Sequence, residues 1–247
     1  FVRFLLLNLI ILPTRPKQSA KAYQSIWQED GSPLLTNSVA LSENAQQLLG
    51  QQFNVALAMR YGKPSIKNAV ASLKHCDDII ILPLFPQYSL AATETAIVKA
   101  LAFVKPHWLP EKISIIKDFY NNAEYINAQA QLIESAFTVE NNQDRMILFS
   151  YHGLPERQIL KTSSCNTVCN MQHVCPVISD KNRDCYRAQC YETSRALAAK
   201  LQLSSEQYTT TFQSRLGRIP WIKPYTDVVL NELAQKGIKH LIVACPS

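Results

Sequence analysis

The feature that most constrains the fold is a set of short apolar, β-rich runs, some of which have no polar face. Ile79-Ile80-Ile81-Leu82 is such a run, and Pro, Gly or polar residues bound each of them. A strand with one face in water alternates polar and apolar residues, whereas a strand in a parallel sheet is covered on both faces. These runs therefore predict strands of a parallel sheet at residues 54–59, 78–84, 112–116, 145–150, 208–212 and 240–244.

The segments between these runs have apolar residues spaced three and four apart, as in amphipathic helices. The expected helices cover residues 17–28, 38–51, 65–75, 93–104, 123–137, 187–201 and 226–236. Strands that alternate with helices indicate the α/β class, with helices on both faces of the sheet.

The polar stretch 140–144 separates two sets of strand and helix units. It predicts two similar Rossmann-like half-domains, residues 1–139 and 144–247, each a parallel sheet flanked by helices, with a cleft between them. Ligands of open α/β sheets bind beyond the carboxyl ends of the strands. The residues that follow each strand are therefore the first candidates for a site.

Charge and hydropathy exclude some classes of protein. The formal net charge of +6 would suit an anionic partner, but Lys and Arg are dispersed, which argues against nucleic acid. The apolar run 1–12 is shorter than the roughly 20 residues that span a bilayer, and it lacks the charged start and cleavage site of a signal peptide. We expect it to form either a core helix or an exposed lip that touches a membrane or an apolar ligand.

A histidine follows the fourth expected strand. His152 stands at its end, and Gly153 and Pro155 then force a turn. A neutral imidazole at such a place can ligate a divalent metal or accept a proton. A single histidine is more often structural, so His152 alone is a weak signal.

The cysteines are concentrated in one segment. Five of the seven lie between residues 161 and 190, namely Cys165, Cys169, Cys175, Cys185 and Cys190. In a chain otherwise built like a cytosolic enzyme, this spacing favours a metal site over disulfides. Four thiolates suit either zinc or an iron–sulfur cluster, which leaves one cysteine spare. Cys76 and Cys245 are expected to be small buried hydrophobic residues.

Ordered motifs of uncommon residues extend along nearly the whole chain. They include Arg15-Pro16-Lys17, Gly31-Ser32-Pro33, Met59-Arg60-Tyr61-Gly62, Pro83-Leu84-Phe85-Pro86 and Gln213-Ser214-Arg215-Leu216-Gly217. Together with the His152 segment, these motifs resemble the ferrochelatases, and in particular bacterial protoporphyrin ferrochelatases with an internal cysteine-rich segment. The resemblance implies a lyase of haem biosynthesis that inserts ferrous iron into protoporphyrin IX.

The resemblance also implies a set of site residues. His152 is expected to be catalytic at the porphyrin centre, as ligand of the substrate iron or as acceptor of pyrrole protons. The expected substrate-binding residues are Ser32, Arg60, Tyr61, Phe85, Tyr88, Tyr120 and Phe212. Two alternatives remain open, a porphyrin- or haem-binding iron–sulfur protein without chelatase activity and a chelatase for coproporphyrin or for cobalt.

Some bacterial ferrochelatases hold a 2Fe-2S cluster in such a cysteine-rich segment, so the resemblance favours this cluster over zinc. Four of the five cysteines would bind it, with Cys190 or Cys169 as the spare residue. His173 is expected to be a loop residue, because a Rieske centre needs two histidines. The expected location is cytoplasmic, with contact to a membrane surface as an open alternative.

Both ends of the sequence look incomplete when they are set beside this family. A first β-unit is expected ahead of Phe1, and the family's catalytic Glu is expected shortly after the strand that ends at Ala244. By itself the chain is therefore expected to have impaired activity.

Overall fold

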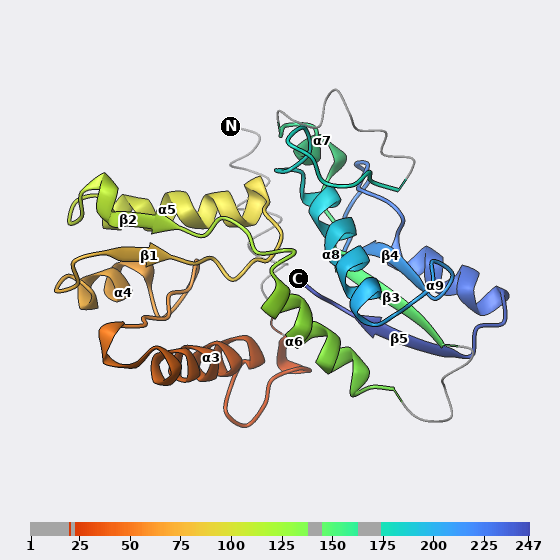
Figure 1. Cartoon of the computed structure of the whole chain (residues 1–247), viewed down its shortest axis with the longest axis horizontal. Coiled ribbons are helices and arrows are strands. Elements are labelled where there is room, and N and C mark those ends of the chain that lie inside the picture. Colours follow the sequence, from red (N-terminus) through yellow and green to blue (C-terminus); the bar gives the residue numbers. More distant parts are fainter. Residues whose placement is uncertain (1–19, 21–22, 138–144, 163–173) are drawn as a thin grey trace. The chain divides into compact units, whose positions relative to one another are not determined.

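The structure is a computed structural model that describes residues 20, 23–137, 145–162 and 174–247 (Figure 1). Helices flank parallel sheets, which confirms the predicted α/β class. The chain divides into two compact units, residues 1–77 and residues 78–247. Each unit is described by itself.

The described part of the first unit is helical. It contains α3 (Pro33–Leu49), η2 (Gly50–Gln52) and α4 (Ile66–Ser72). Pro33 opens α3, where its missing N–H costs nothing, and the Ser65 side chain caps α4 by accepting a hydrogen bond from Asn68 N. The helices predicted at 38–51 and 65–75 are confirmed. The helix predicted at 17–28 lies partly outside the described residues, and in its described part residues 20, 23 and 24 are helical before a turn and an isolated bridge at Gln28.

The strand predicted at 54–59 is wrong. Only Met59 forms an isolated bridge, with Ser65, and no strand runs beside this segment in the described part of the first unit. Its backbone instead bonds to α3, because Gln46 Nε2 donates to Phe53 O at 2.9 Å. Gln46 Oε1 also accepts from Val55 N at 2.8 Å. One side chain thus replaces the neighbouring strand that the pattern implied.

The second unit contains the other five predicted strands, in two parallel sheets. One sheet pairs β1 (Ile79–Ile81) with β2 (Ile113–Ile115). The other has β3 (Arg145–His152) between β4 (Tyr208–Gln213) and β5 (His240–Ala244). The intervening elements are η3 (Leu90–Glu94), α5 (Thr95–Val104), η4 (Pro110–Lys112), α6 (Ala123–Glu134), α7 (Glu156–Ile159), α8 (Tyr186–Lys200) and α9 (Thr226–Gln235).

The central strand β3 is covered on both faces, as its apolar run predicts. Ile147, Phe149 and Tyr151 pack with α6 and α8 in the larger core cluster. Met146 and Leu148 point the other way and pack with Val229 and Leu233 of α9. Successive residues of a strand point to opposite faces, so an apolar run without alternation supplies both cores.

Several sequence expectations concern the surface and the domain boundary. Cys245 is exposed and Cys76 is half-buried, so the expectation that both are buried is wrong.

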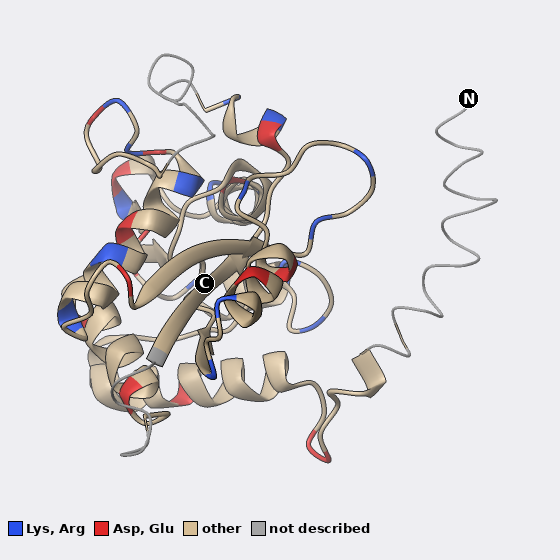
Figure 2. Ribbon diagram, turned by 90° about the vertical axis from the view of Figure 1, so that its right-hand side faces the viewer, with Lys and Arg blue, Asp and Glu red and all other residues tan. Residues whose placement is uncertain are grey.

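Basic and acidic residues are interspersed along the ribbon (Figure 2). None of the described helices combines the length and apolar character needed to cross a membrane. Residues 140–144 lie outside the described ranges, so the two half-domains and the cleft stay predictions.

Candidate active site

His152 ends β3 at the carboxyl edge of the sheet, and its side chain is exposed. Its backbone is held on two sides. Tyr186 Oη donates to His152 O at 2.8 Å, and His152 lies opposite Gln213 of β4 in the parallel register. The imidazole is therefore presented to solvent from a rigid backbone, as a metal ligand or proton acceptor requires.

The turn after His152 is closed by a second chain segment. Gly153 N donates to Gln213 O at 2.8 Å, and Ile222 N donates to Leu154 O at 3.0 Å. A Cβ at Gly153 would stand 2.7 Å from Gln213 O and 3.3 Å from Trp221 Cε3. Glycine is required because the neighbouring backbone comes this close. Trp221 therefore packs against this turn.

The aromatic candidates of the second unit differ in exposure. Phe85, in the loop after β1, is 39% exposed, whereas Tyr88 and Tyr120 are 5% exposed and Phe212 is 1% exposed. Phe212 packs against Tyr151 and Tyr191, with ring centroids 6.2 Å apart in both pairs. Phe85 is therefore the one of these four with a substantially exposed ring, and the other three are buried.

The Tyr88 side chain is held by contacts at its hydroxyl and at its ring. Its hydroxyl donates to Glu94 Oε2 at 2.9 Å, and Lys117 Nζ lies 4.1 Å from the centre of its ring. Burial first, and then the bond to Glu94, raise the pKa of Tyr88 well above its usual value. The phenol therefore stays protonated and acts as a fixed donor.

The remaining substrate candidates belong to the first unit. Tyr61 is 81% exposed, and the Arg60 guanidinium lies 4.7 Å from the centre of its ring. Arg60 Nε is buried and has no hydrogen-bond partner among the described residues. Ser32 precedes α3, and its carbonyl accepts from Thr36 N at 3.0 Å. Contact of these three residues with substrate stays a prediction.

Three of the five clustered cysteines lie in the described residues, and all three are buried (Cys175, Cys185 and Cys190). Arg187 Nη1 lies 2.9 Å from Cys175 Sγ. Burial raises the pKa of the Cys190 thiol well above its usual value. Cys165 and Cys169 lie outside the described residues. Within the described ranges, no three His, Cys, Asp or Glu side chains group as metal ligands.

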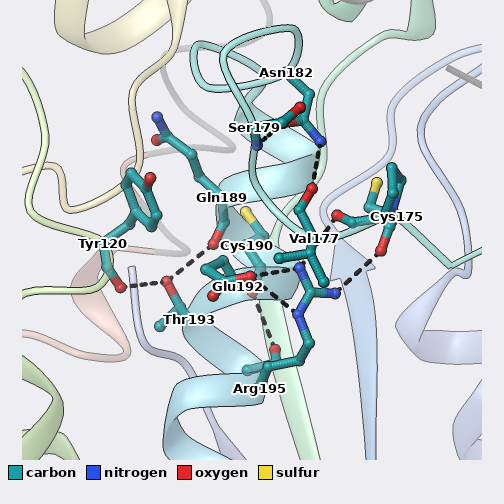
Figure 3. A network of polar contacts seen from close by, with 12 residues as sticks. Tyr120, Cys175, Val177, Ser179, Asn182, Gln189, Cys190, Glu192, Thr193 and Arg195 are labelled. Carbon is teal, nitrogen blue, oxygen red and sulfur yellow. Dashed lines mark hydrogen bonds and ion pairs between the residues drawn. The ribbon is translucent and has the colours of Figure 1, made fainter. Parts of the chain in front are cut away.

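Sequence reasoning missed the buried polar residues of α8. Gln189 and Thr193 are both 0% exposed and take part in the polar network drawn in Figure 3. The missed signal was this pair of polar residues four positions apart, in a helix that buries ten of its fifteen residues.

Fold and site together define an α/β enzyme that presents a histidine at the carboxyl edge of a parallel sheet. Residues 1–247 match the protein family described as Ferrochelatase. A Legionella pneumophila (strain Corby) protein named Ferrochelatase is 53% identical over 245 residues, which are 99% of this chain and 72% of the relative. A Coxiella burnetii (strain RSA 493) protein of the same name is 48% identical over 248 residues, 100% of this chain and 68% of the relative.

The chain belongs to the ferrochelatase family. It is accordingly a lyase of haem synthesis that inserts iron into a porphyrin. These matches do not favour the two alternatives raised by the sequence, a binding protein without activity and a chelatase for another tetrapyrrole.

Proposed function

We propose that this chain inserts ferrous iron into protoporphyrin IX with His152 as the residue that meets the porphyrin centre. The reaction exchanges two pyrrole N–H protons for one Fe²⁺, so the site must bind the metal, accept protons, or do both. Support comes from His152 itself, an exposed imidazole on a backbone fixed by Tyr186 and β4. Preorganised groups of this kind stabilise a transition state without reorganising.

The test is haem formation from ferrous iron and protoporphyrin by His152→Ala. Loss of a positioned proton acceptor or ligand is expected to lower turnover by about 10²- to 10⁴-fold. His240→Ala is the matched control, because His240 is also exposed and opens β5 at the opposite edge of the same parallel sheet. Equal activity of the two variants would refute the role of His152.

A second measurement separates the two roles of His152. If the imidazole is an iron ligand, His152→Ala weakens ferrous iron binding in the absence of porphyrin. If it accepts pyrrole protons, the variant binds iron normally and loses only turnover. Equilibrium binding of Fe²⁺ under anaerobic conditions, measured beside turnover, distinguishes these outcomes.

We also propose that Cys165, Cys169, Cys175 and Cys185 hold a 2Fe-2S cluster and that Cys190 is the spare cysteine. Support comes from the positions of the described members. Cys190 lies inside α8 with 0% exposure, whereas Cys175 and Cys185 precede that helix, and a cation, Arg187, lies against Cys175. The four thiolates would supply the ligand set that such a cluster requires.

The cluster proposal has a direct chemical assay. The purified chain should contain about two iron and two sulfide per molecule and absorb in the visible. Cys175→Ser should lose both signals, and Cys190→Ser should keep them. Zinc bound at the same residues without sulfide would refute the cluster.

The proposed location is cytoplasmic with contact at a membrane surface. The apolar run 1–12 supports this because it offers apolar side chains without reaching the length of a span. Co-sedimentation with phosphatidylglycerol vesicles tests the contact. A variant with Leu5, Leu6 and Leu7 changed to Ser should remain in the supernatant, and equal sedimentation of both forms would refute the proposal.

A further inference from the structure

We infer that α8 is the positioning element of the iron-inserting site, and that Thr193 is its central residue. Thr193 and its neighbour Gln189 fix the loops that follow β1 and β2 and, through Gln87, the residues that follow β5. Those loops carry Phe85, Tyr88 and Tyr120. The inference rests on the proposed function, because it names which residues hold the porphyrin-facing loops in place.

Thr193 and Gln87 together join the segments that follow three strands. Its Oγ1 accepts from Gln87 Nε2 at 3.0 Å and lies 2.8 Å from Tyr120 O, to which it donates. Gln87 Nε2 also donates to Pro246 O at 2.9 Å. Both side chains are buried, with Thr193 at 0% and Gln87 at 2% exposure. The segments that follow β1 and β2 therefore meet at a single buried hydroxyl, and Gln87 links the segment that follows β5 to the same point.

Gln189 adds a second connection one turn earlier in α8. Its Oε1 accepts from Tyr88 N at 2.6 Å, and its Nε2 donates to Arg183 O at 2.7 Å. Both ends of the amide are used, so its orientation is defined. The backbone of Tyr88 is thereby tied to the segment that leads into α8.

The first turn of α8 contacts the strand that carries His152. Tyr186 donates to the His152 carbonyl, and Tyr186, Gln189 and Thr193 are spaced three and four apart. Residues at this spacing lie on one face of a helix. One face of α8 therefore reaches the end of β3 and the loops that follow β1 and β2. Figure 3 shows Thr193 between Tyr120 and the α8 backbone.

The neighbouring residue Ser194 shows what a structural hydroxyl in this helix does. It is also 0% exposed, but its Oγ bonds to Tyr151 Oη at 3.0 Å in the core. Among the described residues, the hydroxyl of Ser194 bonds to Tyr151 and to the Cys190 carbonyl of its own helix, and to no loop at a strand end. Ser194 and Thr193 thus match in burial and chemistry and differ in what they hold.

The experiment compares Thr193→Val, Thr193→Ser and Ser194→Ala in the full chain. Thr193→Val removes the junction without changing side-chain volume much, and Thr193→Ser keeps the hydroxyl. The readouts are protoporphyrin affinity from fluorescence quenching, and the KM values for protoporphyrin and for iron. Thermal unfolding reports the structural cost of each variant.

Thr193→Val is expected to weaken protoporphyrin binding about five- to tenfold, because it removes a buried hydrogen bond that holds the loops of the site. Iron KM should not change. Thr193→Ser should restore wild-type affinity. Ser194→Ala should lower the melting temperature about as much as Thr193→Val does, and it should leave protoporphyrin affinity unchanged.

Two results would overturn the inference, and each differs from failure of the proposed function. Equal protoporphyrin affinity in Thr193→Val and wild type, or equal weakening in Ser194→Ala, means that Thr193 has only a structural role. If Thr193→Val does not fold, Gln87→Ala breaks the same junction from the loop and should weaken binding likewise, and unchanged affinity there also overturns the inference. A wild-type chain that does not bind protoporphyrin would refute the proposed function instead.

Discussion

The two faces of the β4-β3-β5 sheet are covered by helices that differ in how many polar residues they bury. On one face, α9 buries only Val229 and Leu233, which meet Met146 and Leu148 in an apolar cluster. Its polar contact with the sheet lies at its first residue, Thr226, which bonds to Ser150 and Thr211. On the other face, α8 buries ten of its residues, and four of these are polar or charged, namely Arg187, Gln189, Thr193 and Ser194.

This difference distinguishes a helix that only covers the sheet, α9, from a helix that also positions the site, α8. An apolar contact is non-directional and stabilises in proportion to the area removed from water. A buried hydrogen bond fixes the distance and direction of its partners, and it is costly when one partner is missing. Each of the four buried polar residues of α8 has a hydrogen-bond partner. We therefore expect changes at Val229 or Leu233 of α9 to affect stability alone, and changes at Gln189 or Thr193 of α8 to affect the site as well.

The largest expected effect is on the α9 face. Leu233→Ala should lower the free energy of unfolding by about 3 kcal/mol, since a buried leucine is replaced by a cavity. Protoporphyrin affinity should stay unchanged. Leu230→Ala, on the same helix but 37% exposed, is the control and should cost under about 0.5 kcal/mol. Urea denaturation measures both values, and weaker porphyrin binding by Leu233→Ala would break the comparison.

A change at Gly153, directly after β3, tests whether one displacement affects both stability and catalysis. Gly153→Ala should lower the free energy of unfolding by about 2 kcal/mol, because the new Cβ must displace the Gln213 backbone or Trp221. The same shift moves His152, so turnover should fall as well. Measuring urea denaturation and haem formation together detects both effects. Full activity in a destabilised Gly153→Ala would show that the turn tolerates displacement without affecting catalysis.

On the α8 face, Gln189→Leu tests whether losing a buried polar residue has a local effect on the site. It leaves Tyr88 N and Arg183 O without the side-chain partner they have now, at an expected cost of about 1–2 kcal/mol. The loss should be local, so the Tyr88 amide should exchange with deuterium faster than amides of α9. Uniformly faster exchange through the whole unit would mean that Gln189 contributes to stability alone.

The smallest effect concerns Asp118, which Gln189 Nε2 approaches at 3.5 Å. Burial is the main cause that raises its pKa, and Asp184 adds to this, while Arg183 and Lys117 oppose it. A raised pKa means that the ionised carboxylate destabilises the folded chain. The penalty is absent below the pH at which the unfolded carboxyl titrates, and it is complete above the folded pKa.

Asp118→Asn should therefore stabilise the chain at neutral pH, by less than about 1 kcal/mol because the carboxyl is only half-buried and solvent screens it. The gain should disappear at acidic pH. Thermal unfolding at several pH values measures this difference. A gain that is the same at every pH would contradict the assigned cause.

The sequence predicted the second unit well because its signals are local. Runs of apolar and β-branched residues identified β1 to β5, and the Gly153 turn placed His152 at a strand end. The strand predicted at 54–59 failed because its backbone partner is one side chain, Gln46, which no periodicity reveals. Thr193 was missed for a related reason, since its partners lie 106 and 73 positions away in the chain.

The hydrogen bond between Tyr186 and His152 has a consequence for how the protein can change during evolution. It brings together two residues 34 positions apart, so the chain between them leaves the sheet and returns to the same place. The entropy of closing such an excursion grows only logarithmically, by about 0.6 kcal/mol for each doubling of its length. The cysteine-rich segment can therefore be lengthened, shortened or replaced among relatives while the strand end that carries His152 keeps its position.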